Sequence, residues 1–313
     1  MNAGQKPDLT VRFCGIELRN PVIAASGTFG YGVEFEDIVS LDTIGAFVTK
    51  GLSREPMPGN APPRLIETPA GMLNAIGLQN MGVHAFLEKK LPAVQRLPCP
   101  AIANVFGGSI EDYCAVIEAL NAAEGIVAYE LNASCPNTHC GGMVFGTDAR
   151  LLGELVEKAK ALARRPLIVK LSPNVTSIAA MARVAAENGA DAISLINTFL
   201  AVSIDAKTRR PRLANFTGGL SGPAIKPIAL RMVYEAAHAV SIPVIGMGGV
   251  TAPEDVVEFM LAGATAVQVG TASYADPRAV ERIVDGLKDW CQRNRVEQIS
   301  ALTGSLDTSP AQT

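Results

Sequence analysis

An amide, a hydroxyl and a thiol follow one apolar run and form the stretch of this sequence best suited to chemistry. Residues 126–131 are mostly apolar, and Asn132, Ser134 and Cys135 come after them, just before Pro136. Proline has no N–H for a neighbouring strand, so the strand ends there and presents these polar groups in a loop. The glycines that follow make this loop pliable, as a lid over a substrate needs to be; they are Gly141, Gly142 and Gly146.

The thiol in this loop is a candidate for proton transfer. Cysteine acts as a general base where its surroundings stabilise the thiolate, and a small buried cysteine is the structural alternative for Cys135. A metal site at Cys135, His139 and Cys140 is not expected, because no second Cys/His pair lies at zinc-finger or iron–sulfur spacing. With only two further histidines, His84 and His238, the chain shows no Ser–His–Asp arrangement.

The composition indicates a globular, cytoplasmic protein. The 313 residues are 48% hydrophobic and carry a formal net charge of −3. The only dense basic patch, at residues 209–212, is too short to favour a nucleic acid partner. The polar residues 1–10 lack the apolar core of a signal peptide, and no run is apolar for long enough to span a bilayer. The six scattered cysteines do not resemble a disulfide framework.

Short apolar runs alternate with helical segments along the chain. This alternation predicts a single (β/α)8 barrel domain over residues 1–313, with polar tails at 1–8 and about 297–313; a doubly wound sheet is the competitor. Residues 9–19 alternate around Gly15 and predict a hairpin that plugs one end of the barrel. The expected strands are 22–26, 46–50, 101–105, 127–132, 167–171, 192–197, 243–247 and 266–270, and the expected helices include 109–123, 149–164, 176–188, 223–240, 253–262 and 277–292.

Polar residues recur at or near the carboxyl ends of the expected strands. Barrel active sites are built from these strand ends, so their distribution favours the barrel over the doubly wound sheet. The connections 51–81 and 198–222 are too long for plain turns and are expected to fold over the same face. The strand-end residues are Ser26, Lys50, Asn104, Asn132, Lys170 and Asn197.

Glycines close the last two expected strands, in the runs 246–250 and 269–271. Glycine lets backbone N–H groups approach an anion, and barrels often bind phosphate after their seventh and eighth strands. The alternative is tight turns that need glycine for conformation alone. Residues 251–254 resemble a capping box beside this site. A phosphate here could belong to a cofactor or to a sugar-phosphate substrate.

Two cations on different strands indicate which kind of group the barrel mouth binds. Lys50 and Lys170, together with the strand-end amides, suit a planar heterocycle that acquires negative charge, as reduced flavin does. The sequence contains no dinucleotide-binding glycine motif and no cysteine cluster for an iron–sulfur centre. Electron transfer to a pyridine nucleotide would therefore need another subunit.

Several motifs together resemble the dihydroorotate dehydrogenase family over about residues 9–290. The opening segment, residues 20–32, is most similar to the class 1B catalytic subunits. The motifs are Asn132-Ala-Ser-Cys135-Pro-Asn137, Asn74-Ala-Ile-Gly-Leu-Gln-Asn80, Thr49-Lys50-Gly51, Asn197-Thr198, Gly218-Gly-Leu-Ser-Gly222 and Gly248-Gly249.

The resemblance implies oxidation of (S)-dihydroorotate to orotate in pyrimidine biosynthesis. Cys135 would remove a proton from ring carbon 5 while a hydride leaves carbon 6 for FMN, and Lys170 would balance charge on the reduced ring. The FMN-binding residues would be Ser26, Lys50, Gly51, Asn104, Asn132, Lys170, Ile196, Gly222, Gly248, Gly249, Gly270 and Thr271. The pyrimidine would be held by Lys50, Asn74, Ala75, Ile76, Gly77, Leu78, Asn132, Asn197 and Thr198.

Class 1B similarity also implies a partner. Such catalytic chains form a homodimer core and work with an electron-transfer subunit, which carries FAD and a 2Fe–2S cluster and reduces NAD⁺, in a heterotetramer of two chains of each kind. Class 2 members have serine at the position of Cys135 and a membrane-associated extension. The alternatives are a class 1A homodimer that reduces fumarate, a related flavin barrel acting on uracil-like pyrimidines, a non-redox sugar-phosphate lyase or isomerase, and a binding or scaffold protein.

Overall fold

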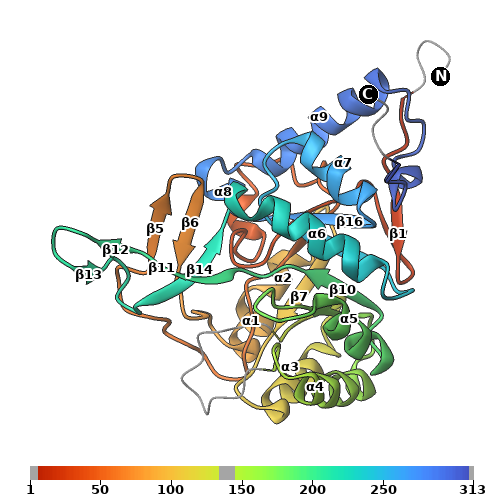
Figure 1. Ribbon diagram of the computed structural model, residues 1–313. Helices are drawn as coiled ribbons and strands as arrows, with labels where there is room; N and C mark the ends of the chain where they lie inside the picture. Colours follow the sequence, from red (N-terminus) through yellow and green to blue (C-terminus); the bar gives the residue numbers. More distant parts are fainter. Residues whose placement is uncertain (1–5, 134–144, 310–313) are drawn as a thin grey trace.

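Eight parallel strands close into a barrel in the computed structural model, which describes residues 6–133 and 145–309 (Figure 1). The strands follow one another around the barrel in chain order, and β9 pairs with β10 to complete the circle. This closure confirms the predicted (β/α)8 barrel and excludes the doubly wound sheet. The strands are β3 (Val22–Ala24), β4 (Ala46–Val48), β7 (Ala101–Val105), β8 (Ile126–Asn132), β9 (Leu167–Lys170), β10 (Ala192–Leu195), β15 (Val244–Met247) and β16 (Ala266–Val269).

The barrel strands are continuous apolar runs because both of their faces are covered. Every residue of β3, β4, β7, β9, β10, β15 and β16 is buried. Side chains on one face fill the barrel, and those on the other pack against the outer helices. Because both faces are buried, apolar and polar residues do not alternate along these segments of the sequence.

Helices surround the barrel in the segments predicted from the sequence. In α9, the buried Val280, Ile283, Val284, Leu287 and Cys291 recur at helical spacing and form one apolar stripe. The predicted helices correspond to α3 (Ile110–Leu120), α4 (Ala149–Leu162), α5 (Ile178–Glu187), α6 (Lys226–Ala237), α7 (Pro253–Leu261) and α9 (Ala279–Arg293). Shorter helices lie before, between and after these longer ones: η1 (Val33–Phe35), α1 (Val83–Lys89), α2 (Leu91–Val94), η2 (Pro223–Ile225), α8 (Ala272–Ala275) and η3 (Ile299–Leu302).

The predicted N-terminal hairpin is confirmed as β1 (Val11–Phe13) and β2 (Ile16–Leu18). Its buried residues belong to the main core, and Cys14 Sγ donates to the carbonyl of Asp191, just before β10. The tip of the hairpin therefore lies at the amino end of the barrel strands, opposite the end where the polar residues gather.

The inner parts of the two predicted polar tails are attached to this same end. The backbone N–H of Asp8 donates to Glu297, and that of Ile299 donates back to Asp8. Ile299 is fully buried. Leu302 also packs against the core, so the first part of the segment from about residue 297 is anchored by apolar contacts. The predicted bounds of the two tails stay a prediction. No helix of the described residues is long and apolar enough to cross a membrane.

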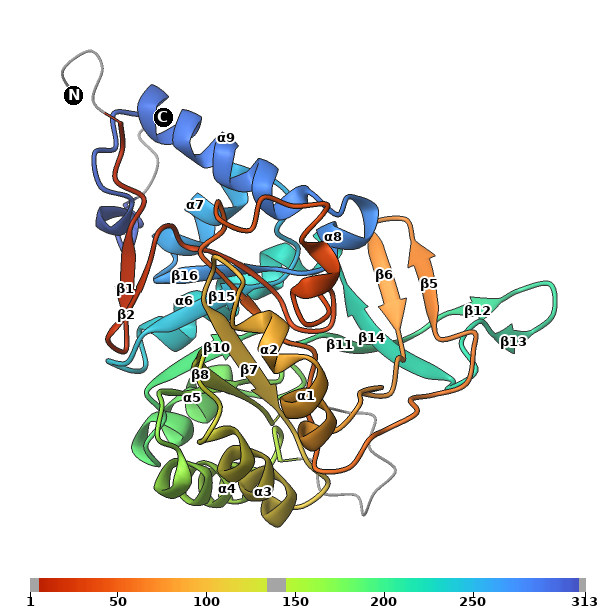
Figure 2. The ribbon, with the colours of Figure 1, turned by 180° about the vertical axis from the view of Figure 1, so that it is seen from behind.

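The two long connections pair with each other in a four-stranded antiparallel sheet beside the barrel. Strand β6 (Gly71–Asn74) lies between β5 (Leu65–Thr68) and β14 (Thr217–Ser221), and β11 (Phe199–Val202) pairs with β14. Figure 2 shows this sheet at one side of the barrel, with β12 (Ile204–Asp205) and β13 (Arg210–Pro211) projecting beyond it. The sheet forms one wall above the carboxyl ends of the barrel strands.

Candidate active site

A cavity of about 1300 Å³, including its open mouth, lies at the carboxyl ends of the barrel strands. Nearly all the residues predicted for cofactor and substrate line it: Ser26, Lys50, Gly51, Asn74, Ile76, Gly77, Leu78, Asn104, Asn132, Lys170, Ile196, Asn197, Thr198, Gly222, Gly248, Gly249, Gly270 and Thr271.

Ala75 is the exception among the described residues. Its side chain is fully buried and packs with Leu73 and Leu213 inside the four-stranded sheet. Its neighbours Asn74 and Ile76 line the cavity. Because successive side chains in extended backbone point to opposite faces, a contiguous binding segment contains a residue that faces away. The side chain of Ala75 therefore faces away from the cavity, and its predicted part in holding the pyrimidine stays a prediction that would rest on its backbone.

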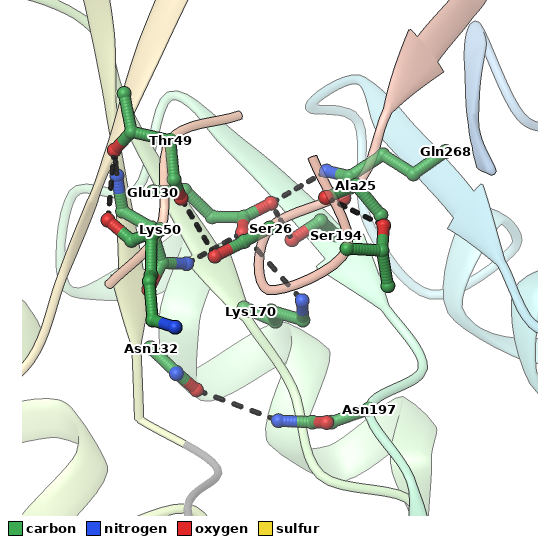
Figure 3. Close-up of polar contacts among 12 residues, drawn as sticks. Ala25, Ser26, Thr49, Lys50, Glu130, Asn132, Lys170, Ser194, Asn197 and Gln268 are labelled. Carbon is green, nitrogen blue, oxygen red and sulfur yellow. Dashed lines mark hydrogen bonds and ion pairs between the residues drawn. The ribbon is translucent and has the colours of Figure 1, made fainter. Parts of the chain in front are cut away.

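Lys50 lies two residues after the end of β4 and reaches the cavity in a half-buried position. Its backbone N–H donates to Gly30, and nearby Ser26 Oγ donates to the carbonyl of Thr49 at 2.7 Å. Burial, and next the positive charge of Arg64, lower the pKa of the Lys50 ammonium below 10.5. Figure 3 shows Lys50, Asn132 and Lys170 converging from separate parts of the barrel.

The amides at the mouth hold one another in place. Asn197 Nδ2 donates to Asn132 Oδ1 at 3.4 Å, and the backbone N–H of Thr198 donates to Asn197 Oδ1 at 2.8 Å (Figure 3). Asn174 Nδ2 in turn donates to the carbonyl of Thr198 at 3.1 Å, and Tyr113 OH to that of Asn132 at 2.8 Å. Fixed amides of this kind suit recognition of a planar ring with alternating donors and acceptors.

A buried carboxylate below the cavity was not predicted. Glu130 on β8 is fully buried and accepts a hydrogen bond from Asn104. It also accepts hydrogen bonds from Ser194 and Gln268 (Figure 3). Its Oε1 lies 3.6 Å from Lys170 Nζ. The sequence carried only a faint signal for it, a lone acidic residue within an apolar run; its four partners come from four other strands.

At three positions at the far end of the cavity, the backbone conformation favours glycine. Gly222, Gly248 and Gly249 have φ of 96°, 130° and 78°, and a Cβ on Gly249 would lie 2.8 Å from the carbonyl oxygen of Gly222. Gly270 differs, because a Cβ there would meet nothing closer than Ala25 Cβ at 3.5 Å. Gly270 therefore leaves space in the cavity that conformation alone does not explain.

The predicted capping box beside these glycines has a different composition. Asp255, not Glu254, accepts from the backbone N–H groups of Thr251 and Ala252, at 2.7 and 2.9 Å. Helix α7 begins at Pro253, so the carboxylate that reaches back belongs to its third residue. Lys226 Nζ is 2.6 Å from Asp255 Oδ1 and neutralises it.

The predicted base, Cys135, lies outside the described residues, as do His139 and Cys140. Among the described residues no group of three or more His, Cys, Asp or Glu side chains is placed to hold a metal ion. The strand β8 that leads to Cys135 ends at Asn132, inside the lining of the cavity.

The family model described as dihydroorotate dehydrogenase matches residues 8–290. The chain belongs to this family. Among its relatives, a dihydroorotate dehydrogenase B (NAD(+)) catalytic subunit from Pelobacter propionicus is 54% identical over 96% of this chain and 99% of its own. The protein of the same name from Geobacter sulfurreducens is 53% identical over 97% and 99%. A protein from Solibacter usitatus, provisionally named dihydroorotate dehydrogenase A (fumarate), is 57% identical over 96% and 99%.

Dihydroorotate dehydrogenases depend on a flavin, and the cavity of this family member fits one. The buried carbonyl oxygens Asn104 Oδ1 and Gln268 Oε1 accept no hydrogen bond from the described residues. A flavin ring offers an imide N–H to such acceptors, and its carbonyl oxygens suit cations such as Lys170. The space at Gly270 is where a phosphate of the cofactor could approach the backbone.

Proposed function

We propose that this chain is an FMN-dependent dihydroorotate dehydrogenase that oxidises (S)-dihydroorotate to orotate. The observation that supports this proposal most strongly is the convergence of two lysines, buried amides and a glycine-lined end in one cavity. A non-redox sugar-phosphate barrel would use the glycine end, but it would not need two buried carbonyl oxygens that accept no hydrogen bond from the described part of the chain.

FMN, when bound, supplies the acceptor for a hydride from carbon 6 of the substrate. Lys170 would lie beside the ring, and the backbone at Gly249 and Gly270 would hold the phosphate. The complete set proposed to hold FMN is Ser26, Lys50, Gly51, Asn104, Asn132, Lys170, Ile196, Gly222, Gly248, Gly249, Gly270 and Thr271.

The substrate would be held by one charge and several amides. The Lys50 ammonium would pair with the carboxylate, and Asn74, Asn132 and Asn197 would exchange hydrogen bonds with the ring amide groups. The remaining contacts come from the backbone around Gly77 and Leu78 and from Thr198, which all line the cavity. Leu78 has a φ of 55°, a conformation that non-glycine residues rarely adopt, so this corner is shaped by the surrounding structure.

Cys135 would act as the base on the face of the substrate opposite the flavin. Its thiolate would take the proton from carbon 5, and the electron pair of that C–H bond would form the double bond between carbons 5 and 6 of orotate. Asn132, three residues earlier, accepts a hydrogen bond from Asn197, which follows β10, two strands away around the barrel. This anchoring fixes the point from which the loop that carries Cys135 departs.

Substitutions at two of the glycines should separate folding from cofactor binding. In Gly270→Ala the backbone and neighbours tolerate the methyl group, so we expect an unchanged Tm of the apoprotein and about tenfold weaker FMN binding, or ~1.4 kcal/mol. In Gly249→Ala the methyl group meets Gly222 at a positive φ, so the apoprotein itself should lose about 1–2 kcal/mol of stability. Thermal unfolding of the apoproteins and FMN titration measure both; unchanged FMN affinity in Gly270→Ala would contradict the phosphate assignment.

The lowered pKa of Lys50 predicts how ligand affinity depends on pH. Orotate binding needs the ammonium form, so the Kd of orotate should start to rise at a lower pH than it would for a lysine of ordinary pKa near 10.4. In Arg64→Gln, which removes the neighbouring positive charge, the rise should move to higher pH. Orotate titrations from about pH 7 to 10.5 test this, because product binding does not require the base. A Kd that stays flat over that range would exclude Lys50 as the carboxylate partner.

We also propose that the electrons pass to NAD⁺ through a partner subunit carrying FAD and a 2Fe–2S cluster, in a heterotetramer with a homodimeric catalytic core. Support comes from the relatives named as NAD(+)-linked catalytic subunits. The relative named for fumarate favours the class 1A alternative. Steady-state assays decide between them: turnover with fumarate by the chain alone supports class 1A, and turnover of NAD⁺ only after addition of an iron–sulfur flavoprotein supports class 1B.

The proposed activity is tested first by the absorbance spectrum of the purified chain and by anaerobic addition of dihydroorotate. Flavin bands that bleach on addition are expected. Bands that stay oxidised would contradict the substrate, and a chain that takes up no flavin even from added FMN would overturn the whole proposal.

A further inference from the structure

One carboxylate beneath the cavity connects five strands of the barrel. Glu130 Oε1 accepts from Asn104 Nδ2 at 2.7 Å, and Oε2 accepts from Ser194 Oγ at 3.0 Å and Gln268 Nε2 at 2.5 Å. Lys170 Nζ lies 3.6 Å from Oε1. Glu130 does not itself line the cavity, whereas Asn104, Lys170 and Gln268 do; these three residues are called the cavity floor below.

The carboxylate decides which way the two floor amides face. A carboxylate only accepts hydrogen bonds, so Asn104 and Gln268 must each turn their NH₂ group toward Glu130. The carbonyl oxygen of each amide then points elsewhere, and both oxygens are buried without a donor among the described residues. A buried acceptor left without a donor loses its hydrogen bond to water and gains none in return, which is unfavourable. The arrangement is therefore best explained by a ligand that brings N–H donors to the floor.

The same carboxylate offsets the charge of the only floor cation. The side chain of Lys170 is 8% exposed and that of Glu130 is fully buried, so water screens their interaction little. With Glu130 in place, the pair is close to neutral as seen from the cavity. Without it, the ammonium would act alone on any charge that develops on a bound ring.

We infer that Glu130 is a positioning residue that presents the two floor carbonyl oxygens to the N–H side of the flavin and moderates the effect of Lys170 on the flavin's reduction potential. The inference rests on the proposed function, since it concerns the flavin of that site. Glu130 would then determine which atoms of the cavity floor face the cofactor. It would also set how much more tightly the site binds one oxidation state of the cofactor than the other.

Glu130→Gln tests both parts. The carboxamide of the variant has an NH₂ group where the carboxylate had an oxygen. Asn104 or Gln268 then has to turn its carbonyl oxygen toward residue 130 and away from the cavity. Oxidised FMN should therefore bind about tenfold more weakly, or weaker still. The unbalanced Lys170 then favours the more negative reduced cofactor. We expect reduced FMN to lose less affinity, with a difference of about tenfold, which raises the potential by ~30 mV for a two-electron couple.

The measurements are FMN titrations in both oxidation states, the potential by equilibration with a redox dye, and Tm of the apoprotein. The matched control is Glu281→Gln, the same change at a buried glutamate of α9 paired with Arg278, outside the cavity lining. It should keep the wild-type potential. Tm falls in either case, because Glu130→Gln leaves the buried Lys170 without its carboxylate. A merely structural role of Glu130 would weaken both oxidation states equally and leave the potential unchanged, and that result would overturn the inference.

Two further variants keep the test decisive if Glu130→Gln does not fold. Glu130→Asp keeps the charge but shortens the side chain, and Gln268→Met removes one floor carbonyl at nearly constant size. We expect both to weaken FMN binding while the potential stays near the wild-type value. Wild-type affinity in both would overturn the inference. A wild-type chain that binds no FMN would instead overturn the proposed function, so the two failures are distinguishable.

Discussion

Replacing Cys135 with alanine is expected to leave FMN bound and to slow its reduction by dihydroorotate roughly 10²–10⁴-fold, the usual contribution of a general base. Cys135 is not among the residues proposed to hold FMN. The flavin content and the visible spectrum of the variant should therefore stay those of the wild type. Anaerobic stopped-flow measurement of flavin bleaching isolates this step from the electron acceptor.

The matched control is Cys114→Ala on the outer helix α3, where the half-buried thiol is away from the cavity and its pKa is raised by burial. This variant should reduce its flavin at the wild-type rate. Cys135→Ser should retain part of the activity only at higher pH, because a hydroxyl is far less acidic than a thiol and is rarely deprotonated near neutral pH. Wild-type bleaching in Cys135→Ala would remove Cys135 from the mechanism.

The barrel could be predicted from the sequence because its strands and helices repeat in a regular alternation. The eight observed strands lie within the predicted runs to one or two residues. The pairing of β6 with β14 could not be predicted, since it joins two connections about 145 residues apart, such as Asn74 and Gly219. Helices α1 and α2 were missed as well, because they are short and the second contains Pro92.

The site residues at the strand ends could be predicted from the sequence, but the buried residue beneath them could not. Lys50, Asn132 and Lys170 could be placed from their position after apolar runs alone. Glu130 could not, because a single acid in a strand is usually solvated, and its burial depends on donors as distant in sequence as Gln268. The contacts of Cys135 stay a prediction.

Replacing Lys170 with methionine should both destabilise the protein and abolish tight FMN binding. Glu130 would then be a buried carboxylate without a cation, and breaking such a pair typically costs 3–5 kcal/mol. Glu130 keeps three other hydrogen-bond donors, so we expect a loss of ~3 kcal/mol, which corresponds to a fall in Tm of roughly 4–5 °C for a chain of this length. Lys160→Met, which breaks a half-exposed pair with Asp191, should cost less than about 1 kcal/mol and leave FMN binding intact.

A double variant separates the two effects of Lys170. In Glu130→Gln/Lys170→Met no uncompensated charge is buried, so most of the lost stability should return, whereas FMN binding should not, because the cation beside the ring is still missing. Thermal unfolding of the apoproteins and FMN titration complete the cycle. If the double variant were as unstable as Lys170→Met, the loss would come from packing and not from the buried charge. If it bound FMN like the wild type, Lys170 would not be a cofactor residue.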